Sequence, residues 1–282
     1  MLIKFTIITL TVSLFLYAIF SALTINQVQV KGTSKESNIL WSENFVSSNW
    51  IDKWYVLEKR KQLLDNIEEI VAQSNKFNKA LRVHFQKGSA SPGLAKKAGF
   101  PYGGANFHAN LGISPSDLLF LRYYLRFADN FDFVKGGKLP GLFGGKVHSA
   151  GRIPDGTNGF STRFSWTGGG MGAVIAYLST APKYGRTITS ADFKFIPGNW
   201  HVIEQQVNLN EFGKDNGVIR VWLDEKLILE EKNLYFRSVD SLKIEGILFS
   251  TFFGGHDASW ATPKDTYIDF ANFAVSNKYI GP

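Results

Sequence analysis

The stretch "GFSTRFSWTGGGMGAVIAYL" (residues 159–178) consists of two short segments joined by a glycine-rich turn. In both segments β-branched and aromatic residues recur with a period of two, the pattern of a β-strand. A turn this short makes the two strands neighbours in an antiparallel hairpin. The stretch therefore predicts antiparallel β-structure in the middle of the chain.

Similar runs recur from residue 39 onward, each bounded by Gly, Asn, Asp or Pro. They are "ALRVHF" (80–85), "LLFLRYYLRF" (118–127), "WHVIEQQVNL" (200–209), "VIRVWLD" (218–224), "KLILEE" (226–231) and "YIDFANFAV" (267–275). One segment, "VLEKRKQLLDNIEEIVAQ" (56–73), has helical character, and we interpret it as a helix or a long hairpin. Helical patterns do not recur between the strands, which argues against a parallel α/β sheet. The sequence predicts an all-β fold, an antiparallel β-sandwich of jelly-roll type.

The N-terminus has the composition of an export signal. Lys4 precedes an uncharged apolar run, residues 5–22, as the n-region precedes the h-region of a secretory signal. An apolar run of about 18 residues is also close to the length of a membrane span. We expect residues 1–22 to be a signal peptide or membrane anchor and residues 23–38 to be a tether. The rest would be secreted, or anchored facing outside the cytoplasm.

Residues 39–282 are expected to form a single domain. The chain has no cysteine, so an exported domain must be stabilised by its core rather than by disulfides. Aromatic residues make up 15% of the sequence, including 24 Phe and 7 Trp, which is enough to fill a sizeable core. No internal repeat or low-complexity linker divides the domain, and we expect a monomer.

Charge and motifs exclude several classes of function. The net charge of +7 suggests an anionic partner, but no stripe of Lys and Arg interleaved with aromatic residues indicates nucleic acid. "GGGMGA" (168–173) lies between two strands rather than before a helix, and "FGGKV" (143–147) lacks the remaining residues of a phosphate loop. The five histidines show no metal-ligand spacing, and no G-x-S-x-G elbow occurs. We expect no cofactor and no metal.

Polar residues on one strand mark a candidate site. Ser161 and Arg163 are two residues apart, so both project from the same face, while Phe160 and Phe164 point to the other. A Ser and an Arg sharing one face of a central strand indicate a wet cleft. The hairpin can place Tyr177 opposite this row. With Lys138, these side chains would form a site for a carboxylate-bearing substrate.

The sequence here resembles polysaccharide lyase family 14. The resemblance rests on "KGGKLPGLFGG" (135–145), "NGFSTRFSW" (158–166), the tyrosine strand after it and "FSTFFGGHDASWATPKDTYIDFANF" (249–273). It covers residues 41–275 and implies a β-jelly roll with alginate lyase or glucuronate-cleaving activity, and hence an acidic polysaccharide as partner.

The family pattern implies four catalytic residues, which are Lys138, Ser161, Arg163 and Tyr177. This sequence departs from the pattern at Ile175, where the family has the first of two tyrosines. In metal-independent β-elimination, cations would stabilise the enolate-like charge and a tyrosine would move the proton. One tyrosine suits glucuronate and mannuronate, whose C5 proton and C4 oxygen leave from one face, better than guluronate. The alternative is a lectin-like binder that has lost the chemistry.

Four further residues are candidates for substrate binding. Lys135 and Lys146 flank the Lys138 segment, and His148 and His201 are candidate second proton donors. Solvated lysines and ordinary hydrogen-bonded histidines remain alternatives at these positions. The glycines of 136–145 predict an open loop, in which Lys138 reaches from the loop to the acid group of a sugar.

Overall fold

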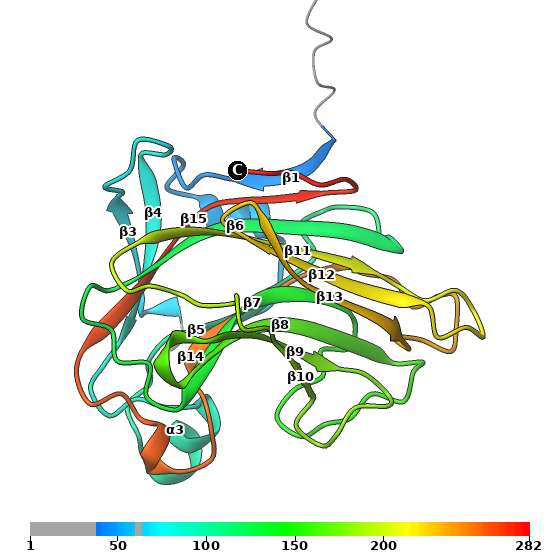
Figure 1. Cartoon of the computed structure of the whole chain (residues 1–282). Coiled ribbons are helices and arrows are strands. Elements are labelled where there is room, and N and C mark those ends of the chain that lie inside the picture. Colours follow the sequence, from blue (N-terminus) through cyan, green and yellow to red (C-terminus); the bar gives the residue numbers. More distant parts are fainter. Residues whose placement is uncertain (1–37, 60–63) are drawn as a thin grey trace, which may run out of the picture. The chain divides into compact units, whose positions relative to one another are not determined.

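A computed structural model of the chain describes residues 38–59 and 64–282. It consists of two antiparallel sheets packed face to face, so the predicted jelly-roll sandwich is confirmed (Figure 1). Sheet A is ordered β13 (Lys226–Leu234), β12 (Gly217–Leu223), β11 (Trp200–Asn208), β6 (Leu118–Phe127), β15 (Thr266–Ser276), β4 (Lys79–Phe85) and β3 (Ile67–Val71), with β1 (Ile39–Glu43) also paired to β15.

Sheet B supports the candidate site. It is ordered β10 (Arg186–Ile188), β9 (Gly172–Tyr177), β8 (Gly159–Thr167), β7 (Gly136–Gly145), β14 (Gly246–Phe253), β5 (Ala105–Ala109) and β2 (Val56–Lys59). Short helices lie in the connections: α3 (Pro92–Ala98) and the 3-10 turns η1 (Trp50–Trp54), η2 (Gly168–Gly170) and η3 (Ala258–Trp260). Ser91 caps α3 by accepting a hydrogen bond from Leu94 N.

Aromatic side chains fill the space between the sheets. Trp54, Trp166, Tyr123 and Phe127 are among the largest fully buried residues. Many of their rings meet edge to face, as Phe127 and Trp166 do at 5.7 Å between centroids, an arrangement that aromatic quadrupoles favour. These residues belong to one continuous hydrophobic core, as the high aromatic content of the sequence predicted.

One expectation, for segment 56–73, needs correction, and another, for the N-terminal segment, lies outside the described residues. Segment 56–73 contributes β2 to sheet B and β3 to sheet A, so it is not a hairpin. The predicted signal or anchor and nearly all of the predicted tether lie outside the described residues. Within the described ranges, no helix has the length and apolarity needed to cross a membrane.

Candidate active site on the outer face of sheet B

The predicted hairpin is present as β8 and β9. Ser161 lies directly opposite Tyr177, and Arg163 lies opposite Ile175. Directly paired residues on antiparallel strands project from the same face. All four side chains therefore belong to the face of sheet B that points away from the core.

The segment 136–145 is a ten-residue strand, β7, in the middle of sheet B, and the expectation of an open loop is wrong. Its glycines serve close packing. A Cβ on Gly141 would lie 2.2 Å from the carbonyl oxygen of Thr162, and one on Gly137 would lie 2.0 Å from the ring of Trp166. Pro140, which cannot donate to a ladder, sits where the register with β8 shifts.

Lys138 reaches the same face from β7. It pairs with Ser165, two residues from Arg163 on β8, while Gly141 lies opposite Arg163 itself. Burial is the main cause that lowers the pKa of Lys138 to about 7, and the neighbouring Arg163 cation lowers it further. Lys138 is thus only partly protonated near neutral pH.

Arg163 is buried and has no carboxylate partner in the described part of the chain. The residue is only 4% exposed, and its Nη1 donates a hydrogen bond to Ser250 Oγ at 3.0 Å. Nε has no hydrogen-bond partner. Burial lowers the pKa of Arg163 to about 10, partly offset by Tyr177, whose ring centroid lies 6.0 Å from Cζ.

The Lys138–Arg163 pair is suited to binding an anion. Among the described residues, neither Lys138 nor Arg163 forms an ion pair, and Lys138 Nζ and Tyr177 Oη have no hydrogen-bond partner. A buried guanidinium beside a partly buried, protonated lysine is unfavourable unless an anion joins them. A substrate carboxylate would supply the missing charge.

Ser161 is also buried, but its proton is already used. Ser161 Oγ donates to the backbone oxygen of His148 at 2.7 Å. Its oxygen can still accept a hydrogen bond, so it can orient a hydroxyl rather than donate to a carboxylate. His148 is 5% exposed, and burial lowers its pKa. Lys146, in the same connection, is exposed.

Lys135 and His201 do not join this group. Lys135 is exposed and its Nζ contacts Ser259 Oγ at 2.6 Å, on the η3 turn. His201 lies on β11 of sheet A, in the opposite layer. Its Nδ1 is 2.7 Å from Asp224 and its Nε2 accepts from Ile196 N. His201 is therefore separated from the Lys138–Arg163 group, and both of its ring nitrogens contact residues of the fold.

Sequence reasoning missed the residues that β14 and β5 contribute. Ser250 lies opposite Asn106, and Leu248 lies opposite His108, on the same two strands. Ser250 is the acceptor for Arg163. The alternation in "FSTFF" (249–253) could have indicated this strand, but the flanking glycines concealed it. Asn106 is partly buried and extends the polar face toward β2.

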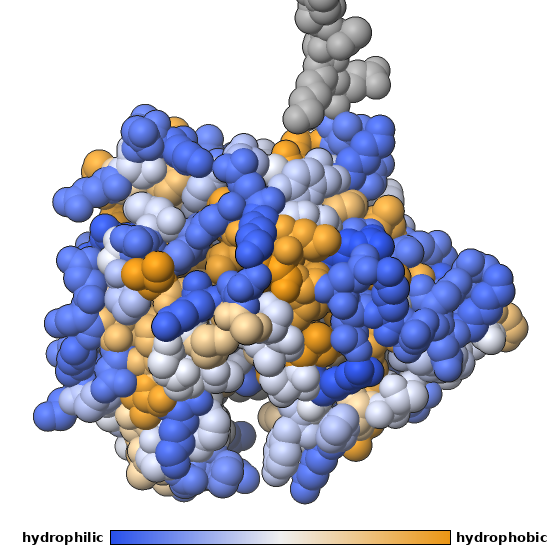
Figure 2. Space-filling view, viewed as in Figure 1, coloured by the Kyte–Doolittle hydropathy of each residue, from blue (hydrophilic) through white to orange (hydrophobic). Residues whose placement is uncertain are grey.

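The surface is hollowed at this face. Figure 2 shows a notch at the lower edge of the molecule, between a lobe where Figure 1 places α3 and a lobe where it places β9 and β10. On the second side, Gly185 lies against Tyr177: a Cβ there would be 3.0 Å from the ring. Tyr177 is consequently only 3% exposed. No group of three or more His, Asp or Glu in the described part could hold a metal ion.

Comparisons with known proteins identify the family and the fold of this chain. The family Polysaccharide lyase 14 matches residues 73–273, and no curated protein matches the sequence. An alginate lyase of family PL-14 from Aplysia kurodai is 29% identical, with a TM-score of 0.72 over 86% of this chain and 99% of that one. Alginate lyase vAL-1 from a Chlorella virus is 22% identical, with a TM-score of 0.62 over 76% of this chain and 90% of that one.

An endo-beta-1,4-glucuronan lyase from the fungus Trichoderma reesei shares the fold at 14% identity, with a TM-score of 0.55 over 85% of this chain and 96% of that one. The fold and the family match define a jelly-roll protein of the polysaccharide lyase class. This chain belongs to polysaccharide lyase family 14.

Proposed function

We propose that this protein is an exported lyase that cleaves uronate-containing polysaccharide by metal-independent β-elimination, with glucuronate or mannuronate linkages favoured. One observation carries the proposal: within the described residues, Lys138 and Arg163 are desolvated side by side without a carboxylate partner, and Arg163 lies beside Tyr177. Alginate and glucuronan lyases among the similar structures support a uronate as substrate.

Arg163 binds the carboxylate of the sugar to be cleaved. A guanidinium matches a carboxylate geometrically, and the unpaired Nε provides a donor. As the C5 proton leaves, negative charge moves onto this carboxylate, and a cation held in a dry site stabilises that charge. Ser250 keeps the guanidinium in place from the neighbouring strand.

Lys138 and Tyr177 divide the proton transfer. Neutral Lys138, whose pKa is about 7, takes the proton from C5. The electron pair forms the C4–C5 double bond, the C4–O bond breaks, and Tyr177 gives its proton to the leaving oxygen. Transfer of a proton from Lys138 to Tyr177 then restores both groups. This assigns the base to Lys138, whereas the sequence suggested Tyr177 for both roles.

The preference for one-face elimination follows from Ile175. Ile175 stands opposite Arg163, where the family has the first of two tyrosines, and it packs against Gly185. Lys138 and Tyr177 both project from the outer face of sheet B, so they suit substrates in which the C5 proton and C4 oxygen leave from the same side. Glucuronate and mannuronate have this arrangement, and guluronate does not.

A non-catalytic binder of acidic polysaccharide is the second candidate. The 3% exposure of Tyr177 favours it, because a phenol that stays covered by the segment around Gly185 cannot reach a leaving oxygen. A binder would use the same cations and leave the polymer intact.

Ultraviolet absorbance of the conjugated product separates the two. Purified protein is mixed with polymannuronate, polyguluronate and glucuronan, and tested in parallel for binding. We expect absorbance to grow with mannuronate or glucuronan, and to fall by about 10²–10⁴-fold in Lys138→Ala and Tyr177→Phe. Lys226→Ala, an exposed lysine on sheet A, is the matched control. Binding without absorbance would identify a binder, and faster cleavage of polyguluronate would contradict the stated preference.

A further inference from the structure

A β-bulge decides which way Lys138 points. The register of β7 with β8 runs from Lys138 opposite Ser165 to Gly141 opposite Arg163, so Leu139 and Pro140 together face one residue of β8. Without the extra residue, regular pairing from Gly141 would place Lys138 opposite Trp166, which is fully buried in the core. A shift by one residue turns every side chain to the other face. The bulge therefore brings Lys138 out of the core to the site.

Two polar side chains of the other sheet hold this bulge through the core. Tyr123, on β6, donates from its hydroxyl to the carbonyl oxygen of Pro140 at 3.0 Å. Gln205, on β11, accepts at Oε1 from Leu142 N at 3.4 Å and from Thr162 Oγ1 at 3.1 Å. Both sheets are thus tied together at the residues that follow Lys138.

Core packing alone does not explain these two residues. Tyr123 is fully buried and stacks on Phe273 at 4.7 Å between centroids. Burial raises its pKa well above the ordinary value, so the phenol remains a neutral donor. Gln205 is also fully buried, and its Nε2 has no hydrogen-bond partner among residues 38–59 and 64–282. Phenylalanine and leucine would fill the same space without the cost of burying polar atoms.

We propose that Tyr123 and Gln205 are positioning residues of the active site: acting from sheet A, they fix the β7 bulge that turns Lys138 to the outer face beside Arg163. The inference rests on the proposed function for its kinetic consequence, but not for its structural one. Bulges next to active sites commonly re-aim a side chain, and here the groups that stabilise the bulge are identified.

Tyr123→Phe tests the proposal, with Tyr124→Phe as the matched control. Tyr124 is the next residue on the same strand, is also buried, and packs against Phe77 on the opposite face of sheet A. We expect Tyr123→Phe to lower kcat by about tenfold with KM unchanged, because one hydrogen bond of typical strength is lost from the bulge. We expect Tyr124→Phe to leave kcat unchanged. Equal kcat in the two variants, measured well below both melting temperatures, would overturn the proposal.

A titration of Lys138 makes the test independent of catalysis. Lysine labelled with ¹³C at Cε is followed by NMR, and Lys138→Arg identifies the signal. We expect Tyr123→Phe and the isosteric Thr162→Val, which removes a partner of Gln205, to raise the pKa of Lys138 toward that of an ordinary lysine. If the pKa of Lys138 is unchanged in both variants, Tyr123 and Gln205 do not position this side chain. If wild-type protein cleaves no uronate, the proposed function fails while this titration still decides the inference.

Discussion

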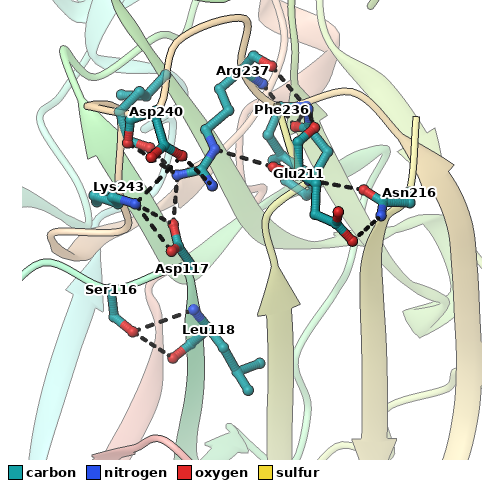
Figure 3. A network of polar contacts seen from close by, with 11 residues as sticks. Ser116, Asp117, Leu118, Glu211, Asn216, Phe236, Arg237, Asp240 and Lys243 are labelled. Atoms are coloured by element: carbon teal, nitrogen blue, oxygen red, sulfur yellow. Dashed lines mark hydrogen bonds and ion pairs between the residues drawn. The ribbon is translucent and has the colours of Figure 1, made fainter. Parts of the chain in front are cut away.

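Two buried arginines, Arg237 and Arg163, are each 4% exposed yet have opposite surroundings. Arg237 lies in the connection between β13 and β14, which crosses from sheet A to sheet B. Figure 3 shows its guanidinium directed at Asp117 and neighbouring carbonyl groups. It donates to Asn210 O at 3.1 Å and to Leu242 O at 2.7 Å.

Among the described residues, Arg163 donates to a single acceptor, the hydroxyl of Ser250, and its neighbour Lys138 is a second basic group. The comparison separates two uses of a buried charge. Arg237 is satisfied within the chain and fixes a connection of the fold. Arg163 has no carboxylate partner among the described residues, so a bound anion would supply its counter-charge.

Replacing each arginine by methionine should therefore have opposite consequences. We expect Arg163→Met to lower kcat/KM by about 10³-fold, because the charge developing on the substrate loses its main stabilisation. The melting temperature should stay the same or rise, since an unpaired buried cation is removed. Rates of ultraviolet absorbance and thermal unfolding measure the two effects. A large loss of stability would mean that Arg163 belongs to the fold rather than to the site.

Arg237→Met should lower the free energy of unfolding by about 2–4 kcal/mol. The substitution leaves buried carbonyl groups of Asn210 and Leu242 without a donor. Asp117 is half-exposed and keeps Lys243 as a partner at 2.8 Å, which limits the loss. Urea denaturation measures the change, and kcat per folded molecule should equal that of the wild type. A change in kcat without a change in stability would contradict the comparison.

The pH profile should report Lys138. Below a pKa of about 7 the amine is protonated and cannot take the C5 proton, so kcat/KM should rise about tenfold per pH unit up to that value. A bound carboxylate favours the charged amine, so the acidic limb of kcat should lie at higher pH than that of kcat/KM. Lys138→Arg, which does not deprotonate, should lose activity throughout. A flat profile across this range would exclude Lys138 as the base.

Stability should depend on pH through the same group. The pKa of Lys138 is lower in the folded chain than the ordinary 10.5, so between about pH 7 and 10.5 the unfolded chain binds the extra proton. Stability should then rise with pH across this window. Denaturation of wild type and Lys138→Met at several pH values measures the slope, which the variant should reduce. Equal slopes would show that Lys138 keeps an ordinary pKa.

The smallest expected effect concerns Ile175→Tyr. A second phenol opposite Arg163 should raise the ratio of polyguluronate to polymannuronate turnover by about threefold, roughly 0.6 kcal/mol. The effect is limited because the ring must displace the segment around Gly185. Ile175→Leu is the control for packing alone. An unchanged ratio in Ile175→Tyr would show that the missing tyrosine does not set the preference.

The strand pattern and the Ser161–Arg163 face followed from local sequence. Period-two alternation fixes which residues share a side of a strand, and the short turn fixed the partner strand. These features need no long-range information. Tyr177 therefore fell opposite Ser161 as the hairpin predicted.

The identity of β7 as a strand, and the direction of Lys138, were decided by tertiary structure. Glycine and proline disfavour a strand locally, but in this sheet the glycines allow Thr162 and Trp166 to approach closely, and a bulge accommodates Pro140. Tertiary structure also decided that His201 lies in sheet A, apart from the candidate site on sheet B. Sequence alone determined which faces are polar; contacts between residues far apart in the chain decided which polar groups meet, because register and burial are properties of the assembled sheets.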